Sequence, residues 1–334
     1  MGISLPSQEA IPTGSISLDK LELIELDNIE IERDKDYLQS LKSLETENFI
    51  DRLFYRPLGY KLATKLKGTG VTPNFITIVS IFVGVAGAIL FYYDFPYWIA
   101  PLGILGMVAA NILDCVDGQL ARMTGIKSKV GRILDGIAGY LWFATVYLAL
   151  ATRLYHQTGH WGFYLLIILS ALSHATQAAV TDYYKTLHLY FLSPETGREF
   201  DTVEGVRTRL KGMKGIPRLF TQFYLYYTQL QHRVTPHLQD LLNYLRVNYP
   251  TGDIPETSRI QFRRGSKIVM RSLDLLTFNG RSIPLFLTIL TGHVWLYFLY
   301  EIVFLNIVLV ATRNQHETLC RYFLMTLRGD HKTV

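Results

Sequence analysis

The stretch NILDCVDGQLARMTGIKSKVGRILDGIAGY, residues 111 to 140, decides the fold of this chain. In it, Asp114, Asp117 and Asp135 stand beside apolar runs that are long enough to cross a bilayer. A carboxylate at membrane depth costs about 2.5–3.5 kcal/mol even on insertion scales, so acids are retained there for pairing, ion binding or catalysis. The stretch therefore predicts two neighbouring membrane helices that meet around acidic groups.

Apolar segments extend on both sides of these acids. A helix needs roughly 20 apolar residues to cross the bilayer core, and four segments suit this length: 71–93, 97–113, 133–151 and 161–180. A later run, 282–312, is short for two spans and long for one. In a chain that is 49% hydrophobic, these runs predict an all-α integral membrane protein.

The distribution of positive charge orients the spans and sets their number. Lys and Arg gather in the connection 122–132, across residues 184–280 and in the C-terminal tail. Under the positive-inside rule all three face the cytoplasm, which requires an even number of spans. We therefore predict six transmembrane helices, the last two joined near Gly292 or Glu301. Among partners we expect membrane lipids and no nucleic acid.

The segments outside the spans differ in character. Residues 1–45 are acidic with few aromatic residues, which favours a flexible, solvated tail. Residues 46–70 place Phe and Leu at helical intervals between Arg and Lys, which is typical of an amphipathic helix in the membrane interface or of a packed surface helix. Residues 71–183 and 281–313 are predicted to form the transmembrane domain. Residues 184–280 are predicted to be a basic cytoplasmic helical insertion, and residues 314–334 a cytoplasmic tail.

Helical spacing brings the acids onto facing surfaces. Asp114 and Asp117 are three residues apart and share one helix face. Gly118 continues that face with no side chain, while Asp135 begins the next helix with glycines one turn away on either side, Gly131 and Gly139. Two helices are thus expected to meet with three carboxylates and several very small residues between them.

Such a cluster suits hard divalent cations. Carboxylate oxygens are preferred ligands of Mg²⁺ and Mn²⁺, which usually keep coordination positions for substrate phosphates. Two such ions can hold both sides of a phosphoryl displacement, and Arg122 is placed to meet phosphate oxygens. The alternative is a set of helix-end aspartates paired with nearby cations, namely Lys127, Lys129 and Arg132.

The spacing resembles the signature of the CDP-alcohol phosphotransferase family in the pattern Asp114-x2-Asp117-Gly118-x2-Ala121-Arg122-x8-Gly131-x3-Asp135. The triplet Thr72-Pro73-Asn74 at the start of the first span and the Arg-Pro helix before it also resemble the family. The resemblance covers about residues 46–190. It implies six transmembrane helices around a polar cavity open to the cytosol, preceded by an interfacial helix and usually assembled as a homodimer.

The resemblance also implies an activity: transfer of a phospho-alcohol group from a CDP-linked donor to an acceptor hydroxyl, with release of CMP, in phospholipid or sphingolipid synthesis. Asp114 and Asp135 would bridge two Mg²⁺ or Mn²⁺ ions, and Asp117 would complete one of them. The CDP part of the donor would be held by Asn74, Gly118, Arg122, Ser128 and Gly131. Two pairs of substrates are compatible with the resemblance: CDP-diacylglycerol with a small alcohol, or a CDP-linked small alcohol with a lipid. The membrane is either a bacterial inner membrane or an endomembrane.

The sequence departs from the family at Gly139, where the signature has a fourth aspartate. The resemblance implies that this residue ligates the second metal and serves as general base, which is worth typically 10²–10⁴-fold. Three explanations compete: His174 or Asp182 replaces it, the protein binds donor and metal but turns over slowly or not at all, or the sequence is a variant altered here. His174 can also be a histidine that only joins two helices.

Two other classes of function compete with an enzyme. A catalytically silent relative would bind donor and metal as a scaffold, and Gly139 is the feature in its favour. An ion-coupled transporter would also use intramembrane acids and broken helices. Against a transporter, the sequence has no visible inverted repeat, and its acids cluster at one membrane face rather than at the midplane.

Overall fold

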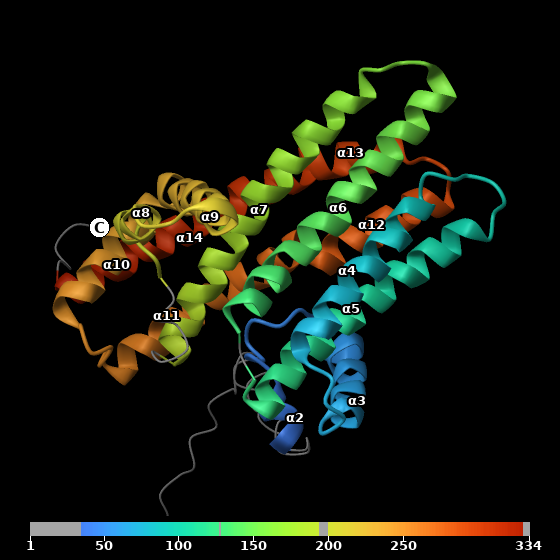
Figure 1. Cartoon of the computed structure of the whole chain (residues 1–334). Helices are drawn as coiled ribbons and strands as arrows, with labels where there is room; N and C mark the ends of the chain where they lie inside the picture. The colour runs from blue at the N-terminus through green and yellow to red at the C-terminus, as the bar shows by residue number, and fades with distance from the viewer. Residues whose placement is uncertain (1–34, 127, 194–199, 330–334) are drawn as a thin grey trace, which may run out of the picture.

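In the computed structural model, which describes residues 35–126, 128–193 and 200–329, this part of the chain is helical and contains no strand (Figure 1). Six helical stretches are long and apolar enough to cross a membrane: Pro73–Leu90, Ile99–Thr124, Leu134–Thr158, Phe163–Leu192, Glu256–Leu290 and Trp295–Arg328. The predicted all-α membrane fold is therefore confirmed, and the chain is a multi-pass membrane protein.

The first four spans form two hairpins. α4 (Pro73–Leu90) turns back into α5 (Ile99–Thr124), and α6 (Lys129–Thr158) turns back into α7 (Phe163–Leu192). Both turns lie at one end of the bundle, which we call the hairpin end, together with the turn that joins the last two spans (Figure 1). α5 and α6 are joined at the opposite end, where the acidic stretch is found.

Local capping signals define the helix ends near the acids. Thr72 caps α4 by accepting a hydrogen bond from the backbone N–H of Phe75, with a proline at the start of the helix. α5 ends at Thr124 and is capped by Gly125, whose φ of +72° is the left-handed conformation that favours glycine. Ser128 then caps α6 by accepting from the backbone N–H of Gly131 at 2.8 Å. The connection between α5 and α6 is therefore short, which keeps the two acidic helix segments together.

Close backbone contact fixes α4 against α5. A Cβ added to Gly87 on α4 would lie 2.9 Å from the carbonyl oxygen of Gly103 on α5, and one added to Gly106 would lie 2.9 Å from the Cα of Gly87. Small residues at a membrane helix interface let the backbones approach in this way. Because α4 lies so near α5, a polar side chain of α4 can reach the acids of α5.

The fifth span consists of α11 (Glu256–Leu273), the 3-10 turn η2 (Asp274–Leu276) and α12 (Phe278–Leu290). The sixth consists of α13 (Trp295–Leu299), the π-helical turn η3 (Tyr300–Phe304) and α14 (Leu305–Arg328). Of the two junctions predicted between them, the structure has the one at Gly292, whose φ is +75°. Glu301 instead lies inside the sixth span, where it is buried and accepts a hydrogen bond from Arg281 of α12.

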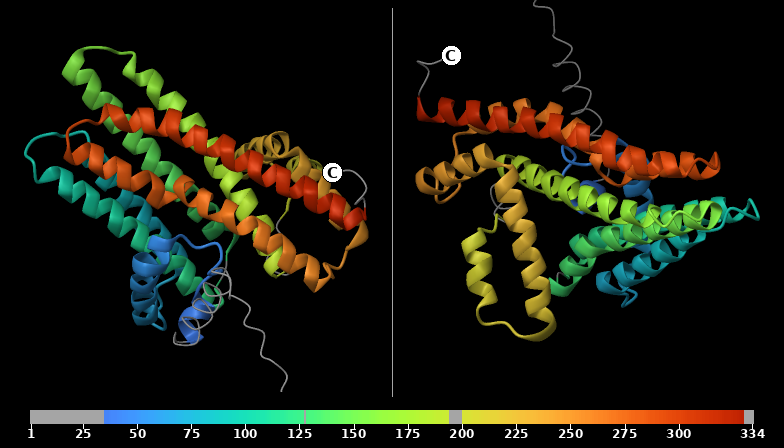
Figure 2. Two further views of the ribbon diagram at one scale, coloured as in Figure 1. Left: turned by 180° about the vertical axis from the view of Figure 1, so that it is seen from behind. Right: turned by 90° about the horizontal axis from the view of Figure 1, so that it is seen from above.

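Several helices run beyond the apolar segments of the sequence. α7 continues to Leu192 and α14 to Arg328, so both extend out of the predicted transmembrane ranges. Between α7 and α11 lie α8 (Val203–Leu210), α9 (Gly215–Val234) and α10 (Pro236–Asn248), and Figure 2 shows α8 and α9 standing out from the bundle. An apolar core that includes Leu238, Phe262 and Phe323 packs α10 against α11 and α14. The cytoplasmic location of this part stays a prediction.

The N-terminal part of the described chain packs against the end of the bundle opposite the hairpin end (Figure 1). It contains α2 (Lys35–Ser40), the π-helical turn η1 (Asp51–Tyr55) and α3 (Arg56–Leu66). α3 packs on α5, and Phe49 and Leu53 are exposed, as an interfacial segment would require. The predicted acidic tail falls outside the described residues as far as residue 34.

Candidate functional site

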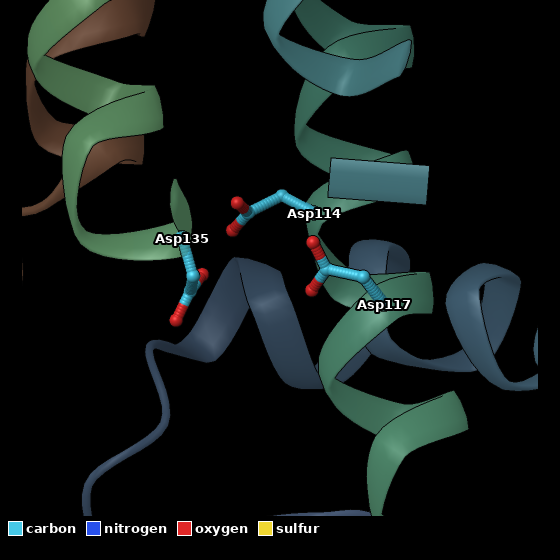
Figure 3. Close-up of side chains that lie close together, drawn as sticks. All are labelled: Asp114, Asp117 and Asp135. Carbon is cyan, nitrogen blue, oxygen red and sulfur yellow. The ribbon is translucent and has the colours of Figure 1, made fainter. Parts of the chain in front are cut away.

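The three aspartates of the acidic stretch lie together. Asp114 and Asp117 project from one side of α5, and Asp135 projects toward them from the first turns of α6 (Figure 3). One oxygen from each carboxylate lies within 4.8 Å of the others. Asp117 is buried, Asp114 is half-buried and Asp135 is exposed, so the cluster opens to one side. The expectation that helical spacing would bring these three carboxylates together agrees with this geometry.

A hydrogen bond from a neighbouring helix orients one of these acids. Thr77 on α4 is buried, and its hydroxyl donates to Oδ2 of Asp117 at 2.5 Å. Partners behind a metal ligand commonly fix its orientation in this way. Sequence reasoning missed Thr77, although it lies one turn after the Thr-Pro-Asn triplet that opens α4.

The donor set fits a divalent cation. Three carboxylates converge, and no Lys or Arg side chain among those that the structure describes forms an ion pair with any of them. Hard oxygen donors in such an arrangement are typical ligands of Mg²⁺ and Mn²⁺. The alternative cationic partners fall outside the described residues or side chains, at Lys127, Lys129 and Arg132.

Three of the predicted substrate residues also meet in space. Ser128 donates a 3.0 Å hydrogen bond to Oδ1 of Asn74, and the backbone N–H of Gly131 donates to Ser128 at 2.8 Å. A Cβ on Gly131 would lie 2.2 Å from that Asn74 oxygen, so this position has no room for a side chain. The start of α4 is thereby tied to the start of α6, beside Asp135.

Arg122 folds over Gly118 on the last turns of α5. Its guanidinium nitrogens lie 3.3 and 3.4 Å from where a Cβ of Gly118 would stand. Nε donates to the backbone carbonyl of Ser40, while the buried Nη2 has no hydrogen-bond partner among the described residues. A buried donor without a partner carries a desolvation penalty that a bound anion would remove.

A cavity of about 310 Å³ adjoins the acidic cluster. It lies between α5, α6, α7 and the η2–α12 segment, and two of its walls carry Asp114 and Asp135. Its size is at the lower end of the range for small-molecule pockets. Sequence reasoning missed several polar residues of its lining, which come from distant parts of the chain: Asn111, Lys185, Thr277 and Arg281.

Gly139 and His174 both line this cavity. A Cβ added to Gly139 would meet nothing within 4 Å, so the helix leaves open space at this position. His174 is only 8% exposed, and its Nδ1 shares a 2.8 Å hydrogen bond with the hydroxyl of Tyr147. Its ring also packs against Phe143, with centroids 5.0 Å apart. These contacts fit a histidine that joins α6 to α7.

A second hollow, of about 530 Å³, lies along η3 and α14. Its lining is aliphatic apart from Asn306 and contains no acidic or basic side chain. This lining offers no charged group that could bind a phosphate or a metal ion, so the candidate site is the smaller cavity beside the aspartates.

Known proteins match the part of the chain that contains this site. Residues 70–193 match the family model described as CDP-alcohol phosphatidyltransferase. An archaetidylinositol phosphate synthase from Pyrococcus horikoshii is 33% identical over 91 residues, which cover 27% of this chain and 46% of that relative. The alignment thus spans about half the length of the curated relative. Residues 70–193, which form α4 to α7 and carry all three aspartates, are a domain of the CDP-alcohol phosphatidyltransferase family.

Proposed function

We propose that this protein transfers a phospho-alcohol group from a CDP-linked donor to an acceptor hydroxyl, releasing CMP, in the synthesis of a membrane phospholipid. The family and the curated relative support a phosphotransferase of phospholipid synthesis. The observation that carries the finer proposal is the convergence of three carboxylates within 4.8 Å at the edge of a cavity. A nucleoside diphosphate needs divalent cations beside it, and this cluster is where such cations would bind.

Asp114, Asp117 and Asp135 would hold two Mg²⁺ or Mn²⁺ ions. Bound there, the ions would neutralise the donor diphosphate and the negative charge that develops on the leaving CMP. Thr77 would keep the carboxylate of Asp117 in position through its hydrogen bond. These assignments make the cluster the place where the donor phosphates sit.

We assign the nucleotide side of the donor to the residues that the resemblance predicts for the CDP part. The unpartnered Nη2 of Arg122 suits a phosphate oxygen. Gly118 lets the Arg122 guanidinium lie against the backbone of α5, while Asn74, Ser128 and Gly131 form a connected polar patch between the starts of α4 and α6. A ligand at this patch would lie between the start of α4 and the acids.

The reaction would proceed by displacement at phosphorus. The acceptor oxygen forms a bond to the phosphorus that carries the alcohol, the bond from that phosphorus to the CMP oxygen breaks, and the hydroxyl proton passes to a base. The curated relative is an archaetidylinositol phosphate synthase, a name that joins a lipid to inositol phosphate, and this favours a CDP-lipid donor and a small polar acceptor. The reverse pairing, a CDP-linked small alcohol with a lipid, is the alternative.

We place the cavity on the cytoplasmic side, because the connections with the most Lys and Arg lie at that end. By analogy with the family, we expect a homodimer. A catalytically silent relative is the second candidate function, and Gly139 is the observation that favours it.

One experiment separates these functions. Purified protein is incubated with a panel of CDP-linked donors and acceptor alcohols in the presence of Mg²⁺ or Mn²⁺. CMP release and product mass are followed, and Mn²⁺ binding is measured by electron paramagnetic resonance. CMP release with a new phosphodiester supports the enzyme. Binding of metal and donor without CMP release supports the silent relative, and absence of metal binding contradicts both.

A further inference from the structure

The cavity beside the acidic cluster contains a carboxylate that does not belong to that cluster. Asp182 of α7 is exposed and lines the cavity together with Asp114 and Asp135. The three clustered aspartates come from α5 and α6, whereas Asp182 stands on the wall formed by α7. A carboxylate on a separate wall can face the acceptor while the others face the metal.

The pairing of α6 with α7 sets the depth of Asp182. The hydrogen bond between Tyr147 and His174 joins the two antiparallel helices at one level. Gly139 lies eight residues from Tyr147 on α6, and Asp182 lies eight residues from His174 on α7. Both steps lead away from the hairpin end and cover about 12 Å along the helix. Both residues line the same cavity, and Gly139 leaves open space there. Asp182 is therefore at the depth where α6 has no side chain.

A contact from a third helix holds the carboxylate. The hydroxyl of Tyr227 on α9 donates to Oδ2 of Asp182 at 3.2 Å. Burial, together with the charge of Asp182, raises the pKa of Tyr227, so its hydroxyl keeps the proton and remains a donor.

We propose that Asp182 is the general base of the transfer reaction and accepts the proton of the acceptor hydroxyl. This assignment rests on the proposed function. As the acceptor oxygen bonds to phosphorus, its proton moves to the Asp182 carboxylate, and the electron pair of the broken bond leaves with CMP. His174 lies two turns deeper among aromatic rings and holds α6 to α7 through Tyr147.

The test compares Asp182→Asn with a matched control, Asp201→Asn. Asp201 also accepts a hydrogen bond from a tyrosine of α9, Tyr224, at 3.0 Å, but it does not line the cavity. Loss of a general base is expected to lower the rate of CMP release about 10²–10⁴-fold. Mn²⁺ binding should stay at the wild-type level in both variants, because neither residue belongs to the metal cluster, and Asp201→Asn should release CMP at the wild-type rate.

Rescue provides a second readout. In the Asp182→Asn background, Gly139→Asp puts a carboxylate at the same depth on the neighbouring helix α6, and we expect it to restore part of the lost rate. The proposal is overturned if Asp182→Asn turns over like the wild type, if it loses Mn²⁺ binding together with activity, or if Gly139→Asp gives no recovery.

The failure of the proposed function has a different signature. A wild-type protein that binds Mn²⁺ and donor but never releases CMP overturns the role of Asp182 and leaves the binding site intact. A wild-type protein that binds no Mn²⁺ overturns the metal site, and with it the proposed function.

Discussion

Thr77 on α4 donates a 2.5 Å hydrogen bond to Asp117 on α5, and both side chains are buried, at 2% and 4% exposure. The bond connects the helix that opens the family domain with the acidic cluster. This hydrogen bond matters because a buried carboxylate without a partner would rotate away or become protonated, and would then be unable to bind a cation. The position of α4 is thus part of the candidate metal site.

We expect Thr77→Val to weaken Mn²⁺ binding. Valine keeps the shape of the side chain but removes the donor, and losing a partner behind a metal ligand typically costs about 10–100-fold in affinity. Thr77→Ser keeps the hydroxyl and is the matched control. Mn²⁺ titration followed by electron paramagnetic resonance measures both, and equal affinity in the Val and Ser variants would show that the bond does not support the site.

Asp114→Ala and Asp135→Ala are expected to abolish metal-dependent binding of a CDP-linked donor. Each removes one of three carboxylates whose oxygens lie within 4.8 Å of one another. Donor binding is measured by calorimetry with and without Mn²⁺, and folding is checked by gel filtration in detergent. If either variant retains metal-stimulated binding, the two-ion arrangement is wrong.

The pair Arg281–Glu301 predicts a stability effect rather than a catalytic one. Arg281 and Glu301 are 1% and 0% exposed, and Arg281 also donates to Gln177 at 2.7 Å. Removing one partner of a buried ion pair leaves a charge uncompensated and costs about 3–5 kcal/mol. We expect Glu301→Gln to lower the thermal stability in detergent strongly, and Arg281→Met with Glu301→Gln to recover much of it. Additive losses in the double variant would show that the two side chains are not coupled.

The number and class of the spans could be predicted from the sequence, because apolar length is a local property. The extent of the helices could not. Helix α7 continues beyond its apolar segment to Leu192, and α14 continues beyond its apolar segment to Arg328. These extensions pack in a separate apolar core, in which Phe191 contacts Phe323. Hydropathy reports where a helix meets lipid, whereas packing between helices decides where it ends.

The candidate site divides in the same way. Asp114 and Asp117 share a face by helical periodicity, and a short connection brings Asp135 to them, so this part follows from spacing. Arg281 and Lys185 enter the cavity only because α12 and α7 pack beside α6. In the sequence, Arg281 stands at the edge of an apolar span and Lys185 at the start of a basic region. No local pattern relates either residue to the aspartates.

Glu45 predicts a pH dependence in the N-terminal segment. Its Oε2 accepts hydrogen bonds from His188 at 2.8 Å and from Arg263 at 3.1 Å, which attach the segment before η1 to α7 and α11. Burial opposes its ionisation, but these hydrogen bonds and charges outweigh burial and lower the pKa from 4.5 to about 2. Because the pKa is lower in the folded state, the stabilisation is complete above about pH 5 and is lost as the pH falls toward 2.

Hydrogen exchange of residues 41–50 measures this effect. We expect protection to decrease between pH 5 and pH 3 in the wild type, after correction for the intrinsic exchange rate. Glu45→Gln should have low protection at both pH values, whereas Glu256→Gln, which removes an exposed carboxylate paired with Arg259, should follow the wild type. A pH response that survives in Glu45→Gln would assign the effect to other carboxylates.

Gly139→Asp in the otherwise wild-type chain tests whether the wild-type site already has a working general base or lacks one. The new side chain has room, since a Cβ at this position meets nothing within 4 Å. If Asp182 already accepts the proton, a second carboxylate at position 139 is redundant. We therefore expect the rate of CMP release to change far less than the 10²–10⁴-fold that a general base is typically worth. A gain of that size would mean that the wild-type site lacks a working base and that the chain is a slow relative of its family.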